Sequence, residues 1–403
     1  MLCSTSMEGL FQTLAIIQIL IGLYLIVQAL EWRGYARRRM RTDSGFYAPK
    51  TAVLCPCKGM EPGLEQNLSA LCEFSHKNYE VFFIVATDSD AALGVVKRVM
   101  ALSKVKAHLV VAGVPDGCAE KVNNLRAAIE QLPEDFEVLV FADSDGRPGK
   151  MWLQRMVGPL GNPKLGATTT MRWFLPRSNN AASLFLAAWN APVVTMLGEK
   201  SRNFCWGGGT AIRRSIFEQI RALEEWRGSV SDDYSLTIAL ERSNFSILFL
   251  PECLTVSFVE TDFAGLLEFG NRQMIITRKY WNKMWATAFA THAFFCFTIL
   301  LGAWLTLGKV VATLPALGLA SLTFLPLLLA AIRGALRVAT VSELLSTYRS
   351  QIMAQSWVYI VLGVLVPFLY LVNFMASLAT RKIYWRGVRY EVISPQQTRI
   401  LSS

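Results

Sequence analysis

The sequence predicts an α/β domain with a mostly parallel sheet, joined to helices that span a membrane. The mean hydropathy of +0.34 is high for a soluble enzyme, and only 17% of the 403 residues are charged. The apolar residues are concentrated in 1–30 and 284–379. Between them, short β-branched runs alternate with helical windows, which is typical of an α/β domain. This composition disfavours a purely soluble protein and excludes a disordered one.

The charged residues indicate what the protein binds, and the cysteines and histidines indicate whether it has a zinc site or disulfides. The net charge of +10 would suit nucleic acid or an anionic membrane surface, and the arginine clusters beside the apolar runs favour the membrane. We therefore expect no nucleic-acid partner. Eight cysteines without paired spacing and three histidines predict neither a zinc site nor a disulfide framework.

Residues 10–30 predict the first span. This run of 21 residues has no formal charge and is long enough to cross about 30 Å of hydrocarbon. A cleaved signal peptide is the alternative, but the run lacks a basic leading region and a cleavage site. Only Glu8 precedes the run, whereas five arginines follow it: Arg33, Arg37, Arg38, Arg39 and Arg41. The positive-inside rule then places the next domain, 43–262, in the cytosol.

The domain 43–262 contains the elements of the expected sheet. Strands are expected at 51–55, 80–86, 106–112 and 137–142. Helical windows with apolar positions three and four residues apart lie between them, at 64–74, 91–103 and 119–132. In such sheets ligands bind beyond the carboxyl ends of the strands, so the residues after each strand are candidates for a binding site.

Acidic residues follow two of the strands. Asp88 comes after the second strand, and Asp143 and Asp145 come directly after the fourth. Two carboxylates at a strand end can hold Mg²⁺ or Mn²⁺ together with phosphate oxygens and water. The alternative for Asp143 and Asp145 is a turn with solvated acids, because such tetrapeptides are common in turns.

A third acidic site precedes a helix. Asp232 and Asp233 come before the apolar helical stretch 235–240, where one carboxylate could cap the helix or act as a general base. No single acidic site is decisive, but three of them at element ends in one domain favour a catalytic site.

Basic and glycine residues are expected at the same rim of the sheet. Lys58 follows the first strand, and Lys121 and Asn123 open the helix before the fourth strand. A lysine there can pair with a diphosphate, and a solvated surface lysine is the alternative. Gly208 belongs to a glycine-rich turn, 206–210, which permits close approach of the backbone to a ligand. This turn matches neither a Walker loop nor the dinucleotide fingerprint.

The C-terminal part predicts an interfacial helix, further spans and a basic tail. The segment 263–283 is amphipathic, and its cations could face lipid phosphate or a substrate diphosphate. The polar stretch 333–351 interrupts the apolar region, so the spans are expected to carry almost no charge, which disfavours a transporter. Three uncharged runs lie within 284–379: 284–308, 310–332 and 352–379.

Four spans in total would place the basic tail, 380–403, on the outer side, against the positive-inside rule. Two alternatives resolve the conflict. Either one run is re-entrant or interfacial, with a break at Pro315, Pro326 or Pro367, or the tail breaks the rule. Both alternatives remain open at this point.

One ordered set of motifs resembles a known family. The set consists of Cys-Lys-Gly at 57–59, Asp88, Lys-Val-Asn-Asn-Leu at 121–125, Asp-Ser-Asp at 143–145 and Asp-Asp at 232–233. In this order the motifs resemble the ceramide glucosyltransferase family of membrane-bound glycosyltransferases, whose catalytic domain has a GT-A (Rossmann-like) fold. The similarity runs from about residue 10 to 390, and it includes a closing Trp-Arg-Gly-Val-Arg-Tyr at 385–390.

The resemblance implies a role for each motif. Asp88 would contact the nucleotide, and Asp143 with Asp145 would bind the metal, Mg²⁺ or Mn²⁺, and the donor diphosphate. Asp232 and Asp233 would be catalytic, with Asp233 as the base. The donor would also be bound by a set of polar and glycine residues: Lys58, Lys121, Asn123, Gly208, Gln273 and Arg278.

The implied reaction is the inverting transfer of a sugar from a nucleotide-diphosphosugar, such as a UDP-sugar, to a membrane lipid, as in glucosylceramide synthesis. The protein would be a multi-pass membrane protein with its catalytic domain on the cytosolic face. The family pattern Gln/Arg-x-x-Arg-Trp is altered here, because 273–277 is Gln-Met-Ile-Ile-Thr. The alternatives are a processive polysaccharide synthase and a non-catalytic, membrane-anchored protein that binds sugar nucleotides.

Overall fold

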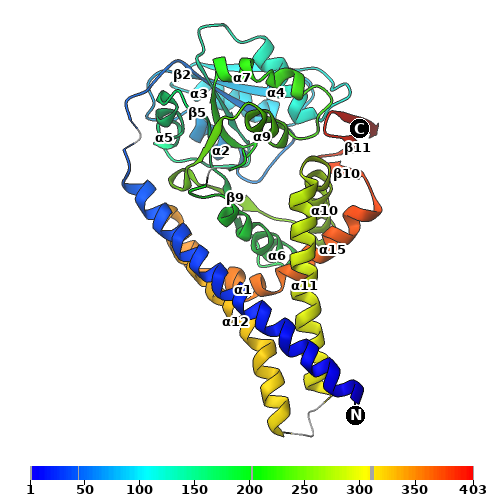
Figure 1. The fold of residues 1–403 in the computed structure, drawn as a ribbon. Helices are drawn as coiled ribbons and strands as arrows, with labels where there is room; N and C mark the ends of the chain where they lie inside the picture. Colours follow the sequence, from blue (N-terminus) through cyan, green and yellow to red (C-terminus); the bar gives the residue numbers. More distant parts are fainter. Residues whose placement is uncertain (1, 44, 201–202, 309–312, 403) are drawn as a thin grey trace.

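The structure, a computed structural model, describes residues 2–43, 45–200, 203–308 and 313–402. An α/β domain lies at one end of a set of long helices, and the amino terminus lies at the far end of these helices (Figure 1). The carboxyl terminus lies beside the α/β domain.

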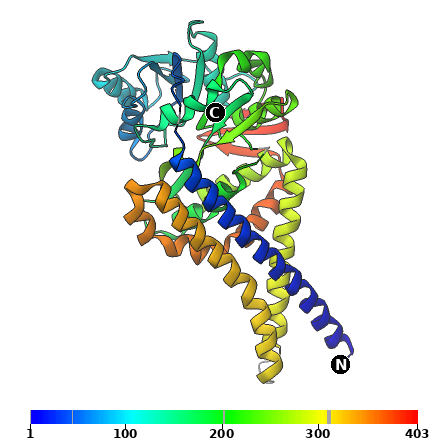
Figure 2. The same ribbon diagram turned by 60° about the vertical axis from the view of Figure 1, so that its left-hand side comes forward.

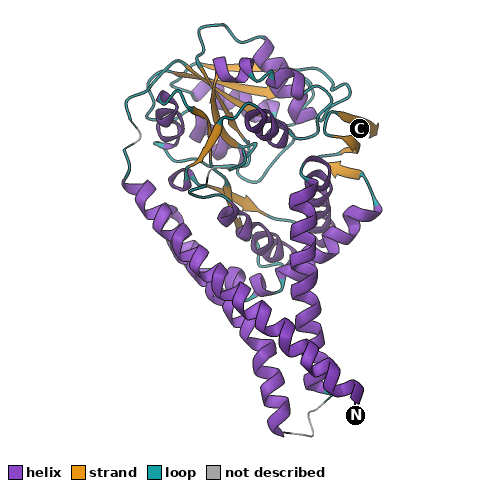
Figure 3. Cartoon of the chain, in the orientation of Figure 1, coloured by secondary structure: helices purple, strands orange, loops and turns teal. Residues whose placement is uncertain are grey.

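A seven-stranded sheet forms the centre of the α/β domain, with the strand order β3-β2-β1-β4-β7-β5-β8. Neighbouring strands are parallel except at β7, which runs antiparallel to β4 and β5 (Figure 3). The four predicted strands are confirmed, with each end within one residue of the prediction. The strands are β1 (Thr51–Pro56), β2 (Tyr79–Val85), β3 (Ala107–Val111), β4 (Val138–Ala142), β5 (Leu165–Thr169), β7 (Gly209–Arg213) and β8 (Ser246–Phe249).

Helices cover both faces of this sheet, which explains why its strands are apolar at nearly every position. Successive side chains point to opposite faces, so Leu54 packs with Leu125 and Leu236 in one layer, whereas Val53 packs with Leu68 in the other. The helices of the domain are α2 (Leu64–Leu71), α3 (Leu93–Leu102), α4 (Glu120–Glu130), α5 (Trp152–Val157), α7 (Arg214–Gln219), α8 (Ala222–Glu225) and α9 (Asp232–Arg242).

A second, two-stranded sheet lies between the main sheet and the long helices. It consists of the parallel strands β6 (Arg172–Pro176) and β9 (Thr255–Val259), next to α6 (Ala181–Asn190) (Figure 1). The amphipathic segment forms α10 (Phe263–Tyr280), which packs against α15 and the C-terminal strands.

Within the described residues, three helices are long and apolar enough to cross a membrane: Ser6–Arg41 of α1 (Leu2–Arg41), α11 (Asn282–Leu307) and Ala316–Leu344 of α12 (Thr313–Leu344). The run expected at 352–379 is not straight, because Ser356–Val364 and Val366–Ala379 are bent by 61°, so a fourth span exists only if this pair counts as one. Pro367 lies in the first turn of α15 (Val366–Ala379), where it prevents a continuous helix. The short helices before the bend are α13 (Arg349–Ala354) and α14 (Ser356–Ile360).

The C-terminal tail packs against the α/β domain, which bears on the expected number of spans. It forms the three-stranded sheet of β10 (Lys382–Trp385), β11 (Val388–Ser394) and β12 (Gln397–Ser402). Tyr390 is buried in the same apolar layer as Leu54, and its hydroxyl accepts a hydrogen bond from the Glu120 amide at 3.3 Å. The tail therefore lies on the same side as the α/β domain, which three spans allow and four straight spans do not.

The structure also corrects the expectation that the spans carry almost no charge. The run expected at 310–332, whose first three residues lie outside the described residues, continues as α12 to Leu344. Arg333 and Arg337 are therefore inside a candidate span. They are tolerated because α12 packs along α1 and α14 (Figure 2), so a polar face can be buried in protein instead of lipid.

Candidate active site

One cavity of about 820 Å³ lies between the α/β domain and the long helices. Its polar end is formed by residues that follow β1 and β4, as expected at the carboxyl ends of parallel strands. The glycine-rich turn before β7, the first turn of α9 and one face of α10 complete this end. The same cavity is lined farther on by residues of α1, α11, α12 and α15.

A lysine joins two of the acidic sites at the polar end. The Lys121 Nζ, in the first turn of α4, lies 2.8 Å from Asp143 Oδ1 and 3.3 Å from Asp232 Oδ2. Asp143 directly follows β4 and Asp232 begins α9, so three elements that are distant in sequence meet at one cation. All three side chains are less than a fifth exposed.

Arg172 adds a second cation to this cluster. Its Nη2 lies 3.6 Å from Asp143 Oδ2, and its Nη1 pairs with Asp145. Sequence reasoning missed Arg172, because nothing local marks an arginine that begins a short strand of a separate two-stranded sheet. Lys121 and Arg172 therefore hold the carboxylates of Asp143 and Asp145 at the carboxyl end of β4. The alternative of a turn with solvated acids does not describe this site.

Burial and the neighbouring charges shift the pKa of each group in this cluster differently. Burial alone would lower the pKa of Lys121, but the charges of Asp143 and Asp232 outweigh burial and raise it. Burial would likewise raise the pKa of Asp143, and Lys121 and Arg172 reverse this and lower it. Burial raises the pKa of Asp232 to about 6, against the effect of Lys121 and with the help of the neighbouring carboxylates.

Asp232 should give the protein a pH-dependent stability that Asp232→Asn removes. Its pKa rises from 3.8 to about 6 in the folded protein, so between these values the folded state binds more protons than the unfolded chain. The stabilisation from this group is complete below about pH 4 and is lost as pH rises through about 6. In thermal unfolding scans the stability of the Asn variant relative to the original protein should therefore improve with rising pH. A relative stability that does not change with pH would contradict the raised pKa.

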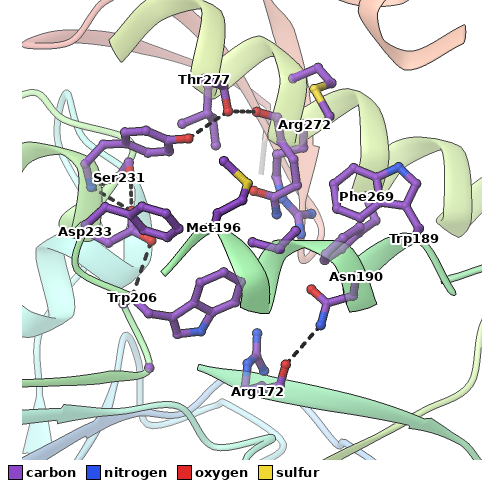
Figure 4. Close-up of a pocket in the computed structure, with 18 of the residues that line it drawn as sticks. Arg172, Trp189, Asn190, Met196, Trp206, Ser231, Asp233, Phe269, Arg272 and Thr277 are labelled. Carbon is purple, nitrogen blue, oxygen red and sulfur yellow. Dashed lines mark hydrogen bonds between the residues drawn. The ribbon is translucent and has the colours of Figure 1, made fainter. Parts of the chain in front are cut away.

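Asp233 faces the cavity from the first turn of α9. One carboxylate oxygen accepts hydrogen bonds from the Ser231 hydroxyl and, at 2.8 Å, from the Tyr234 amide. The other accepts a hydrogen bond from the Gly207 amide at 3.3 Å. These donors orient the carboxylate toward the space that Arg172 also borders (Figure 4). The start of α9 therefore positions Asp233, and Ser231 caps the helix.

The glycine-rich turn lets the acidic groups come close to the backbone. A Cβ on Gly208 would overlap the Asp143 carboxylate, and a Cβ on Gly207 would lie 2.6 Å from Asp232 Oδ2. The turn reaches this place because β7, which follows it, pairs antiparallel with β4. Glycine is required here by the protein's own carboxylates, independently of any ligand.

The structure brings most of the predicted site residues to this cavity. Lys58, Lys121, Asp143, Asp145, Gly208, Asp232, Asp233 and Gln273 all line it. Lys58 is paired there with Glu120 at 2.5 Å, a contact that the sequence did not indicate.

Three predicted site residues, Asp88, Asn123 and Arg278, are not among the described residues that line the cavity. Asp88 is exposed beyond the end of β2. Asn123 donates its side-chain amide to the Gly113 carbonyl at 3.1 Å. Arg278 donates to the Ser377 carbonyl on α15. The roles of these three residues stay predictions.

The C-terminal tail closes one side of the polar end. Arg386 pairs with Glu61, and its guanidinium lies 3.9 Å from Asp145 Oδ2. It also donates to the Lys58 carbonyl at 3.0 Å. The Glu61 carboxylate in turn accepts a hydrogen bond from the Ser144 hydroxyl at 3.1 Å. The closing motif at 385–390 was the signal in the sequence for this contact.

Arg272 of α10 lies on a different side of the polar end from Asp233 (Figure 4). Burial and the nearby Arg172 charge lower the pKa of Arg272 to about 10. Trp385 and Phe269 lie 5.3 Å from its guanidinium carbon, measured to the ring centroids. Two arginines that repel each other across one space favour an anion between them.

The polar end fits a divalent cation that is shared with phosphate oxygens. The described residues contain no group of three or more His, Cys, Asp or Glu side chains that would hold a metal ion by themselves. Asp143 and Asp145 offer two carboxylates, and Mg²⁺ and Mn²⁺ are often held by one or two carboxylates, water and the phosphates of a substrate. The donor set therefore fits an ion that arrives with a diphosphate.

Comparisons with known proteins give one matching family and a set of solved structures, among them a mannosyltransferase and a mycobacterial protein. The model of glycosyl transferase family 21 matches residues 12–398. The mannosyltransferase PcManGT from Pyrobaculum calidifontis, solved in complex with GDP-Man and Mn²⁺, is 15% identical, with a TM-score of 0.47 over 92% of this chain and 98% of that one. A mycobacterial protein is 14% identical, with a TM-score of 0.37 over 57% of this chain and 74% of that one.

Proposed function

The chain belongs to glycosyl transferase family 21, and from this membership we propose that it transfers a sugar from a nucleotide-diphosphosugar to a lipid acceptor at the membrane surface. The membership confirms the resemblance to ceramide glucosyltransferases and the GT-A fold class, and it makes the protein a glycosyltransferase. The donor class, the lipid acceptor and the stereochemistry are parts of the proposal.

This proposal rests on one cavity that extends from the α/β domain to the long helices. Its polar end contains the cluster of Lys121, Asp143 and Asp233, and its other end is lined by Leu25 of α1 and Phe374 of α15. A soluble nucleotide sugar suits the polar end, whereas the apolar chain of a lipid suits the end between the helices. A hydroxyl at the head of such a lipid would then reach the acidic residues without leaving the cavity.

The polar end supports a direct displacement with inversion at the sugar. Asp233 would accept the proton of the acceptor hydroxyl as its oxygen bonds to the anomeric carbon and the bond to the diphosphate breaks. Lys121 and Arg172 would stabilise the departing diphosphate, where negative charge develops. Asp143 and Asp145 would hold a divalent cation, which would neutralise part of the diphosphate charge when bound.

We further propose that the protein crosses the membrane several times with the catalytic domain in the cytosol. Arginines at the end of α1 support this orientation under the positive-inside rule. Two of them pair with Glu343 of α12, Arg33 at 2.7 Å and Arg37 at 2.8 Å, where both helices meet the α/β domain. The basic C-terminal tail lies on this same side, as the rule requires.

Lipid extraction after incubation with labelled donors tests the proposal. The purified full-length protein, in lipid, should transfer label from a UDP-sugar to a single-sugar glycolipid. Chelation of divalent cations should reduce the rate at least about tenfold, because the diphosphate would lose its counter-charge. A long soluble polysaccharide would instead identify a processive synthase. No transfer or hydrolysis of any nucleotide sugar in the panel would identify a non-catalytic binding protein.

A further inference from the structure

Two arginines line the membrane end of the cavity. Arg333 and Arg337 are four residues apart on α12, so their side chains lie on one face of the helix, and both line the cavity. Arg337 is only 5% exposed, and its Nε has no hydrogen-bond partner. Neither guanidinium forms a hydrogen bond or an ion pair with another residue in the part of the chain that the structure describes.

The polar groups near these arginines are occupied elsewhere. The Tyr370 hydroxyl donates to the Trp189 carbonyl at 2.6 Å, and His292 Nδ1 bonds to the Ala288 carbonyl at 2.7 Å. The acidic side chains that line the cavity belong to its polar end: Glu120, Asp143, Asp145, Asp232 and Asp233. The first three are paired with Lys58, Lys121 and Arg172, and Asp232 lies against Lys121.

A buried arginine without a counter-charge is costly, so the pair requires an explanation. Removal of a guanidinium from water carries a desolvation penalty comparable to the whole stability margin of many proteins. Two guanidiniums in a cavity offer parallel N–H donors, the geometry that matches phosphate or carboxylate. An anion that enters the cavity would offset the cost.

The position of the pair on α12 favours a lipid as the source of this anion. Arg337 precedes Glu343 by six residues, so it lies about 9 Å farther along α12 toward the amino-terminal end of that helix than the Arg33–Glu343 pair. The apolar helix α1 packs along α12, and its residues Tyr24 and Gln28 line the same cavity. The donor diphosphate, in contrast, has its own cations at the polar end of the cavity.

We propose that Arg333 and Arg337 bind the anionic head group of a membrane lipid. This binding stands independently of the proposed function, because the site lies at the other end of the cavity from the acidic cluster and the binding does not specify the acceptor of the sugar.

Binding is tested with the full-length protein in nanodiscs of phosphatidylcholine, with and without phosphatidylglycerol. Phosphatidylglycerol should raise the melting temperature and be retained in native mass spectra. Arg337→Met should weaken this binding about 10- to 100-fold, the loss expected for a hydrogen bond to a charged group. Arg337→Lys should retain part of it. The matched control is Arg349→Gln, an exposed arginine on α13 outside the cavity lining, which should bind as the original protein does.

The thermal stability of each variant shows whether a variant that binds no lipid is still folded. In phosphatidylcholine alone, Arg337→Met should be at least as stable as the original protein, because it removes an unpaired buried charge. Equal effects of phosphatidylglycerol on the original protein, Arg337→Met and Arg349→Gln would overturn the proposal. Protection by inorganic phosphate as strong as that by phosphatidylglycerol would also overturn it, since the site would then serve a soluble anion.

Transfer measured in the same nanodiscs separates the arginine site from the proposed function. Binding of phosphatidylglycerol without transfer to any lipid would refute the proposed function and leave the arginine site intact. Transfer to a lipid without any binding of phosphatidylglycerol at the arginine pair would refute the arginine site and leave the proposed function intact.

Discussion

Asp233→Asn should abolish sugar transfer and leave donor binding nearly unchanged. The Asn side chain has almost the same shape but cannot take a proton from the acceptor hydroxyl, and removal of a general base costs about 10²- to 10⁴-fold in rate. The hydrogen bonds from Ser231 and the Tyr234 amide can still be accepted by the amide oxygen, so the start of α9 should remain in place. The measurement is kcat for transfer to lipid, together with the dissociation constant of the donor.

Asp262→Asn is the matched control for this prediction. Asp262 also lies at the start of a helix, where it caps α10 by accepting a hydrogen bond from the Gly265 amide at 2.8 Å. It is exposed and is not among the described residues that line the cavity. We expect its kcat to stay close to that of the original protein. An Asp233→Asn variant that keeps more than about a tenth of the original kcat would refute Asp233 as the base.

Asp143→Asn should lower kcat/KM about 10²- to 10³-fold and raise the Mn²⁺ concentration needed for half-maximal activity. The carboxylate lies against both Lys121 and Arg172, so its loss leaves two cations without their shared partner at the place proposed for the diphosphate. Stability should also fall, by about 3 kcal/mol, because Lys121 and Arg172 lose a buried ion-pair partner and keep only one carboxylate each, Asp232 and Asp145. Activity is therefore compared at a temperature where thermal unfolding shows both proteins to be folded.

Asp135→Asn is the matched control for Asp143→Asn, because it breaks an ion pair that lies outside the proposed site. Asp135 pairs with Lys50 at 2.5 Å, but it is 61% exposed and outside the cavity lining. Its replacement should change neither the Mn²⁺ dependence nor kcat/KM by more than about twofold, as expected for an exposed ion pair. An unchanged Mn²⁺ dependence in folded Asp143→Asn would refute its proposed role at the metal.

The alternation of apolar strands and amphipathic helices predicted the α/β domain closely. The end of a strand can be recognised from neighbouring residues alone. The apolar run at 138–142, for example, changes at Asp143 into a polar turn. A residue at the end of one strand is also placed near the ends of its parallel neighbours by the geometry of the sheet. Lys58 and Asp143 could therefore be assigned to one rim without knowledge of packing.

The same reasoning misplaced elements whose position depends on distant contacts. The end of α12 could not be found from apolarity alone, because Arg333 and Arg337 interrupt the apolar run but not the helix, which packs along α1 and α14. The bend before α15 was one of several proline breaks that the sequence allowed. The side on which the tail lies follows from the burial of Tyr390 against the α/β domain, 270 residues after Glu120.

The amino-acid sequence thus determined which segments are strands, which are apolar helices and which acidic residues end them, because these properties depend on short windows of neighbouring residues. The tertiary structure alone decided that Arg172 and Arg386 join the acidic cluster and that a pair of arginines faces the other end of the same cavity. Such contacts depend on how whole elements pack, and no local pattern carries that information.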